Sequence, residues 1–347
     1  MGRHAGNPQE ARSRFSFREV IPIRIQKAEI DDQEKVASHA SQAIPLTGIL
    51  LLVMVCFLWG GNIVTIKVSN QGIPPILAAT LRSLLAAGLL WAYARWKGER
   101  VFLALKDLKH SLALGLLFGF DFLFLYWGPS FTDASRAVIF LYTQPLWTAL
   151  GAHFILVGDR LNGAKGAGLL LAFGGLTAVF ASRSATLGPL YWLGDLMEVI
   201  AALFWASTSI YIKKVIQDRP ITHFQTLFAQ LLYSVPFLAA GSVIFEWDKP
   251  VALNTLMVSA FLYQTFVVAF FSYLLWFWMI HRYQVIRLAA FTFLAPLFGV
   301  VLSGLLLGES LTLPLWVGLG LVAAGIYLVN RPETQARVSG GVSRSDS

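Results

Sequence analysis

Charged residues are scarce in this chain of 347 residues. Asp, Glu, Lys and Arg together make up 13% of it, whereas an ordinary soluble domain contains roughly 25%. A soluble protein of this length would form about two domains, and both domains would still need a charged surface. The low charge therefore excludes the soluble globular class.

Cysteine is almost absent, because Cys56 is the only one. An intrachain disulfide is excluded, and no Cys/His spacing typical of a metal site occurs, so we expect no metal and no cofactor. No Walker-type nucleotide loop is found either. Residues 1–45 lack the apolar stretch of a cleavable signal. We predict that they form a polar, disordered cytoplasmic tail.

Apolar residues are abundant instead: 56% of the chain is hydrophobic, and the mean hydropathy is +0.64. Ten apolar runs are each close to the roughly 20 residues that a helix needs to cross a bilayer. In lipid they must be helices, because the backbone finds no partner outside its own segment. The sequence thus predicts an all-α integral membrane protein, multi-pass in the cell (inner) membrane, with spans at 46–68, 73–94, 111–129, 134–157, 164–181, 190–212, 223–245, 254–280, 285–307 and 313–330.

The Lys and Arg residues are distributed unevenly between the two ends of these spans. If the N-terminus is cytoplasmic, 21 of the 27 lie in cytoplasmic segments and only Arg183 and Lys249 lie in external loops. Such an excess is the positive-inside pattern of membrane proteins. We therefore predict that both termini are cytoplasmic, with residues 331–347 as a second tail. The net charge of +8 then has a membrane explanation, and we expect a lipid bilayer and no nucleic acid as partner.

The chain also contains an internal repeat. Residues 58–67 of the first span match residues 204–213 of the sixth, and an Arg precedes a Pro by nine residues in both the fourth and ninth spans. Gly168 and Gly175 match Gly318 and Gly325 at an offset of 150. We predict two repeats, 46–181 and 190–330. Each has five spans, so the second enters the membrane from the opposite side, as in many secondary transporters.

Several of these motifs resemble those of a known family. Residues 59–62 (Trp-Gly-Gly-Asn), residues 144–147 (Gln-Pro-Leu-Trp) and the Gly-Asp and Gly-Glu elbows at 158 and 308 are similar to the drug/metabolite transporter superfamily. Within it, the chain resembles the ten-helix EamA-type exporters. The resemblance implies efflux of small metabolites, amino acids or drugs by alternating access, and no enzymatic activity. A homodimer is left open.

One other class of function stays open at this stage. A polytopic membrane enzyme acting on a lipid or isoprenoid head group would share the membrane plan. Such an enzyme needs clustered acid, base or metal-ligating residues, and no run of His, Asp or Glu provides them. We therefore favour the transporter.

Eight residues of the repeated spans are candidates for a cargo site. Proline removes a backbone donor and bends a helix, and a bent pair in matching positions can shape a cavity. Trp59 and Trp205 are symmetry mates far from the interfaces, where packing is the alternative to stacking on cargo. The predicted substrate-binding set is Trp59, Asn62, Tyr142, Gln144, Pro145, Trp205, Thr292 and Pro296.

The charged residues within spans suggest two further roles. Arg136 and Arg287 are expected near opposite membrane surfaces, where they either extend to head groups or clamp an anionic group as gates. Asp121 and Glu198 are candidates for coupling, by accepting a proton or binding an ammonium group, with Asp121 favoured. The alternatives are an ion pair of Asp121 with Arg82, or a Glu198 that reaches the outer interface.

The charge count and the repeat generate a topological prediction. Cysteines introduced near Asn70, Ser130 and Lys249 should react with an impermeant thiol reagent added outside cells, and cysteines near Lys106, Lys165 and Lys214 should not. Labelling is measured before and after membrane permeabilisation, which reveals sites that are merely buried. The opposite pattern at positions 165 and 249 would contradict the inverted repeat.

Overall fold

A computed structural model describes residues 44–181, 188–307 and 311–331, and every regular element in these ranges is helical. Most of both expected tails, the elbow at Gly308 and Arg183 lie outside the described residues. The first half consists of α2 (Leu46–Ser69), α3 (Pro75–Lys97), η1 (Leu105–Asp107), α4 (Leu108–Trp127), η2 (Gly128–Ser130), α5 (Ala134–Leu141), α6 (Gln144–Ile155) and α7 (Gly163–Ala181). The second half consists of α8 (Tyr191–Asp218), α9 (His223–Glu246), α10 (Thr255–Leu262), η3 (Tyr263–Ser272), α11 (Tyr273–Arg282), α12 (Val285–Thr292), α13 (Leu294–Leu307) and α14 (Leu313–Asn330).

The predicted membrane spans are present. Nine helical segments of the described chain are long and apolar enough to cross a bilayer. The tenth expected span, 134–157, is divided between α5 and α6, and together they cover the same stretch. Large apolar side chains such as Phe154 and Leu313 are exposed on the outer surface of the bundle, as a lipid-facing surface requires. The all-α, multi-pass membrane fold is therefore confirmed.

The fourth and ninth spans are interrupted rather than merely bent. The first break lies between α5 and α6 at Tyr142 and Thr143, directly before Gln144 and Pro145. The second lies between α12 and α13 at Phe293, three residues before Pro296. A proline cannot donate its amide and clashes with the carbonyl four residues back, so each helix restarts at its proline. The two breaks occupy matching positions in the two repeats.

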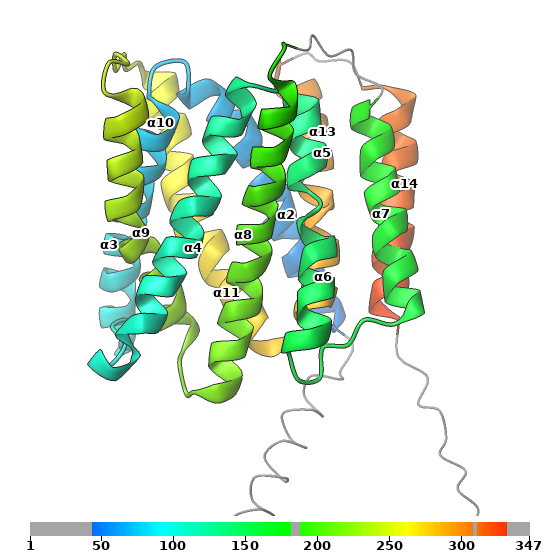
Figure 1. Ribbon diagram of the computed structural model, residues 1–347, viewed down its shortest axis with the longest axis horizontal. Helices are drawn as coiled ribbons and strands as arrows, with labels where there is room; N and C mark the ends of the chain where they lie inside the picture. Colours follow the sequence, from blue (N-terminus) through cyan, green and yellow to red (C-terminus); the bar gives the residue numbers. More distant parts are fainter. Residues whose placement is uncertain (1–43, 182–187, 308–310, 332–347) are drawn as a thin grey trace, which may run out of the picture.

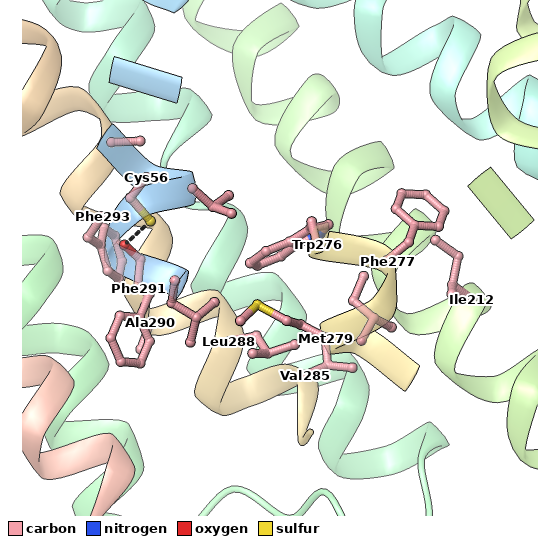
Figure 2. Packing of buried hydrophobic residues seen from close by; sticks show 14 of the residues in the cluster. Cys56, Ile212, Trp276, Phe277, Met279, Val285, Leu288, Ala290, Phe291 and Phe293 are labelled. Atoms are coloured by element: carbon pink, nitrogen blue, oxygen red, sulfur yellow. Dashed lines mark hydrogen bonds between the residues drawn. The ribbon is translucent and has the colours of Figure 1, made fainter. Parts of the chain in front are cut away.

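Side chains satisfy backbone carbonyls around both breaks. The Thr143 hydroxyl donates to the Phe140 carbonyl (2.6 Å), and the Thr292 hydroxyl donates to the Ala289 carbonyl (2.7 Å). Cys56 on α2 donates its thiol to the Phe291 carbonyl at 3.1 Å, the contact drawn in Figure 2. Because lipid supplies no donors, these contacts make an irregular backbone tolerable inside the membrane.

The eighth span contains a second irregularity. Between α10 and α11 lies η3, a ten-residue π-helical segment. A wider helix of this kind is rare and usually occurs at functional sites. Its Gln264 side chain donates to the Thr65 carbonyl (3.2 Å) and the Ser69 hydroxyl (2.8 Å) of α2. Tyr263 donates to the Leu58 carbonyl at 3.0 Å. The π-helical segment is thus fastened along the length of α2.

The two halves of the chain pack mainly against each other. The helix α7 lies beside α14 at one edge of the bundle, and α3 lies with α9 at the opposite edge (Figure 1). Between them, α2 packs on α13, and α4 packs on both α8 and α9. The interior is therefore shared between the repeats, so a movement of one half relative to the other changes the interior directly.

The α7–α14 contact depends on small residues. A Cβ at Gly168 would lie 2.6 Å from the Gly325 carbonyl oxygen, and one at Gly175 would lie 2.9 Å from the Gly318 carbonyl oxygen. These are the four glycines that the repeat comparison paired. Their missing side chains let the two backbones approach closely.

This packing generates a prediction with an internal control. Gly168→Ala and Gly175→Ala should each lower stability by about 1–3 kcal/mol, because the added methyl meets backbone. Gly166→Ala and Gly174→Ala lie on the same helix with nothing within 4 Å of the new Cβ. These controls should be neutral or slightly stabilising, since alanine is the better helix former. Thermal unfolding of the purified variants in detergent measures the difference. Equal midpoints for all four variants would contradict the close-packing interpretation.

Candidate functional site

A cavity of about 370 Å³ lies in the middle of the bundle. Its wall comes from both repeats: α2, α4 and α5 contribute from the first half, and α8, α9, η3 and α11 from the second. The volume suits a small organic molecule, and the lining is mostly apolar and aromatic with a few polar groups, as in typical ligand sites.

Tryptophans form the centre of the wall. Trp59 of α2 lies 5.1 Å from Trp276 of α11 and 6.1 Å from Trp205 of α8, measured between ring centroids. Tyr142 at the first helix break meets Trp205 edge-on at 5.9 Å. The Trp59 indole nitrogen donates to the Ser272 hydroxyl at 2.9 Å. This bond fixes the ring of Trp59 while leaving much of its surface available to the cavity.

Six of the residues singled out from the sequence line this cavity: Trp59, Asn62, Asp121, Tyr142, Glu198 and Trp205. The sequence thus predicted side chains that the fold brings together from α2, α4, α8 and the break between α5 and α6. The Asn62 side-chain oxygen is buried and has no hydrogen-bond partner among the described residues. It is therefore available to a ligand.

The other four substrate-binding candidates do not line the cavity. Gln144 is fully buried and donates to the Thr148 hydroxyl one turn further along α6 (2.7 Å). Thr292 is also fully buried, and its hydroxyl is engaged with the Ala289 carbonyl. Pro145 and Pro296 lie in the first turns of α6 and α13 and are not among the lining residues. In this conformation these residues shape the breaks, and their expected contact with cargo stays a prediction.

The two arginines occupy unequal environments although the repeat relates them. Arg136 pairs with Asp195 of α8, with Nη2 to Oδ2 at 2.5 Å, and Thr132 donates to the same carboxylate at 2.7 Å. Arg287 is only 1% exposed. The expectation that Arg287 extends to head groups is therefore wrong: α12 is packed inside the bundle instead of lying against lipid.

Asp121 and Glu198 are the acidic groups of the cavity wall. Asp121 is 5% exposed and lies within electrostatic reach of Arg82 on α3, whose guanidinium stacks 4.6 Å above the ring of Phe122. Glu198 is fully buried, so it does not reach an interface. Neither oxygen of Glu198 has a hydrogen-bond partner among the described residues.

The backbone at Gly128 makes room for Glu198. A Cβ at this turn residue would lie 2.6 Å from the Glu198 Oε1 atom, so a larger residue would require the carboxylate to shift. The described residues contain no group of three His, Cys, Asp or Glu side chains that could hold a metal ion.

Sequence reasoning missed part of the wall. Tyr126 of α4, Gln230 of α9, and Tyr273 and Trp276 of α11 line the cavity as well. Gln230 is 4% exposed, and its side-chain oxygen has no partner in the described structure. These helices carry no motif that the repeat comparison detected. A polar residue in an otherwise apolar span, such as Gln230, was the available signal.

The cavity is closed at one end by a polar network. Asp159, on the turn after α6, accepts from the Val285 and Ile286 amides at the start of α12 (2.5 and 3.2 Å). Gln284 donates to the Gly158 carbonyl at 2.6 Å. Burial raises the pKa of the Asp159 carboxyl. The first repeat is thereby attached to the start of the ninth span, beneath the tryptophans.

The opposite end is open. There the cavity reaches Asn70 at the end of α2, Pro129 in η2 and Ala134 at the start of α5, and Asn70 is exposed. No residue of the turns at 158–162 or 281–284 contributes to the described wall. The described wall therefore ends in exposed residues at one end of the bundle, and the Asp159 network lies beyond its other end.

Comparison with known proteins adds an independent finding. Residues 46–181 and 192–331 both match the EamA-like transporter family. The chain is 30% identical to the "Probable amino-acid metabolite efflux pump" of Escherichia coli (strain K12), over 80% of this chain and 93% of that protein. The protein of the same name from Salmonella typhimurium is 31% identical, over 84% and 98%. The "Uncharacterized transporter YoaV" of Bacillus subtilis is 24% identical, over 80% and 94%.

A crystal structure shares the fold. It superposes with a TM-score of 0.69 at 18% sequence identity and covers 81% of this chain and 96% of its own.

The tryptophan wall generates a prediction. Trp59→Ala, Tyr142→Ala and Trp205→Ala should each reduce flux through the cavity about tenfold or more, because each removes aromatic contact area worth more than 1 kcal/mol. Flux is measured in vesicles and divided by the amount of folded protein. Trp192→Ala is the control, since this side chain of α8 is 55% exposed on the outer surface. Loss of abundance in step with loss of flux would support a packing role instead.

Proposed function

Because the chain belongs to the EamA-like transporter family, we propose that it exports small metabolites of the amino-acid class across the cell (inner) membrane. It is a secondary transporter and not an enzyme. One observation carries the proposal: a cavity lined by both repeats is open at one end and sealed at the other. This is one of the two states that alternating access requires.

The charge distribution supports an assignment of the two ends. If the N-terminus is cytoplasmic, the turn that bears Asp159 faces the cytoplasm and the open end faces outside. The structure then represents an outward-open state, from which cargo leaves. Inward opening requires the Asp159 carboxylate to separate from the α12 amides. The cavity is built entirely from one chain, so the proposal does not require the homodimer left open above.

We place proton coupling at the two buried acids, and the geometry favours Glu198 over Asp121. A buried charge needs a partner. Asp121 has Arg82 within reach, whereas the charged groups within reach of Glu198 are the acids Asp121 and Asp195. Glu198 therefore needs a proton or a cationic cargo in each state of the cycle. Exchange of one for the other would couple efflux to the proton gradient.

Flux against external pH tests this assignment. Vesicles containing wild type, Glu198→Gln or Asp121→Asn are supplied with external radiolabelled phenylalanine or 2-phenylethylamine, with no membrane potential. Glu198→Gln should lose accumulation driven by a pH gradient and keep downhill exchange that does not vary with pH. Asp121→Asn should retain the pH response at a lower rate, because the buried Arg82 guanidinium loses the negative charge within its electrostatic reach.

Asp218→Asn serves as the charge-matched control, because that side chain is exposed and pairs only with Lys214 (3.1 Å) among the described contacts. If Glu198→Gln and Asp121→Asn both accumulate cargo with the wild-type pH profile, neither acid carries the coupling. Loss of the pH response in Asp121→Asn alone would return the assignment to Asp121.

A further inference from the structure

The charges around the cavity do not balance. Two other acids lie near Glu198: Asp121 and Asp195 are each within its electrostatic reach. Arg136 neutralises Asp195 through the 2.5 Å contact, and Arg82 lies opposite Asp121. Glu198 is left over, fully buried, with neither oxygen hydrogen-bonded within the described chain. With all three acids ionised, the group as a whole would carry one uncompensated negative charge.

The described cavity wall contains no side chain that could supply the missing positive charge. None of the described residues that line the cavity is Lys, Arg or His. The buried polar atoms of lining residues that have no hydrogen-bond partner within the described chain are all oxygens: both of Glu198, Asp121 Oδ1, and the amide oxygens of Asn62 and Gln230. Oxygen acceptors without donors recognise a group that donates hydrogen bonds or carries positive charge.

The apolar part of the wall lies at a defined distance from this acid. Trp205 follows Glu198 by seven residues on α8, which places both on one helix face about 10 Å apart along the axis. Trp59 stands against Trp205 from the facing helix, and Trp276 stands against Trp59. A ligand several ångströms long, with a charged end and an aromatic body, can contact both regions at once. The indole faces also attract cations directly.

We propose that the cargo is a monovalent organic cation: an amine with an aromatic or bulky apolar body, whose ammonium group pairs with Glu198. That the cation is transported rests on the proposed function. That it binds is inferred from the cavity alone.

The same charges disfavour other forms of an amino-acid metabolite. A free carboxylate in this cavity would lie near Asp121 and Glu198 with no basic side chain in the described wall, and a buried unpaired charge is costly. A decarboxylated, amidated or esterified amino acid retains the ammonium group but has no free carboxylate, so the cost of burying an unpaired negative charge does not arise. The cavity is therefore selective for the amine, amide or ester over the zwitterion.

A matched series of phenyl compounds tests this selectivity. The purified protein in detergent is titrated calorimetrically with 2-phenylethylamine, 2-phenylethanol, phenylalanine and 3-phenylpropionate, which share one ring and differ in charge. The amine should bind about tenfold or more tightly than the neutral alcohol, because a charge-assisted contact to a buried acid is strong. Phenylalanine should bind more weakly than the amine, and 3-phenylpropionate most weakly.

Variants assign the preference to a residue. Glu198→Gln should remove the advantage of the amine over the alcohol, and Glu198→Asp should restore part of it. Continued binding of 2-phenylethanol to Glu198→Gln shows that the cavity is intact, so a loss of amine binding is not loss of the fold. Asp218→Asn removes the same charge at an exposed site and should behave as wild type.

The outcomes separate this inference from the proposed function. Equal binding of the amine and phenylalanine, or an amine preference that survives in Glu198→Gln, would overturn the cation assignment. Transport of the neutral or anionic compounds in vesicles would agree with the proposed export function but would overturn the cation assignment. If the amine binds as expected but no compound of the series moves across the vesicle membrane, the proposed function fails and the binding assignment holds.

Discussion

The structure depends on one constraint: inside lipid, every backbone amide and carbonyl must find its partner within the protein. Two spans are interrupted, at Tyr142–Thr143 and at Phe293, so backbone groups there cannot all find partners within their own helix. Both breaks are therefore confined to the interior, where hydroxyl groups one turn away and the thiol of Cys56 reach the carbonyls. Figure 2 shows this thiol among the tightly packed side chains of the core. The cavity lies beside the first break, where Tyr142 joins its wall.

How much of this could be predicted from sequence follows from the same constraint. Length and hydropathy locate the spans because a bilayer has a fixed thickness. The repeat pairs Trp59 with Trp205 because equivalent positions of the two halves carry the same residue type. Which face of a span lines the interior is harder to predict, because lipid and protein interior are both apolar. Arg287 and the missed Trp276 illustrate this. Arg287 was assigned to the membrane surface by its place near a span end, yet α12 is surrounded by protein. Trp276 lies in a span whose partner carries no matching motif.

The contacts at the two ends of the cavity explain why only one of them is open. At the sealed end, backbone amides of α12 are held by Asp159, and the Lys213 ammonium group donates to the Ile280 and Tyr283 carbonyls (2.8 and 2.9 Å). These bonds join α8, α11, α12 and the turn after α6, which belong to different repeats. The Arg136–Asp195 pair also joins the two repeats, near the start of α5. The α7–α14 contact is different, because it depends on close backbone packing at glycines and not on polar groups.

The buried acids show how a functional carboxylate differs from a structural one. Asp159 accepts from two amides at the start of α12, and Glu246 accepts from two amides at the start of α3 (3.0 and 2.9 Å). Both complete helix N-termini, where backbone donors and the helix dipole stabilise negative charge. Asp195 forms an ion pair with Arg136. Glu198 is buried as deeply as any of these, yet the described chain gives it neither amide, hydroxyl nor cation. An ionised carboxylate that is buried without a partner destabilises the folded state, so Glu198 has no structural role that explains its position. Its partner must therefore arrive from outside the chain, as a proton or as the positive end of the cargo.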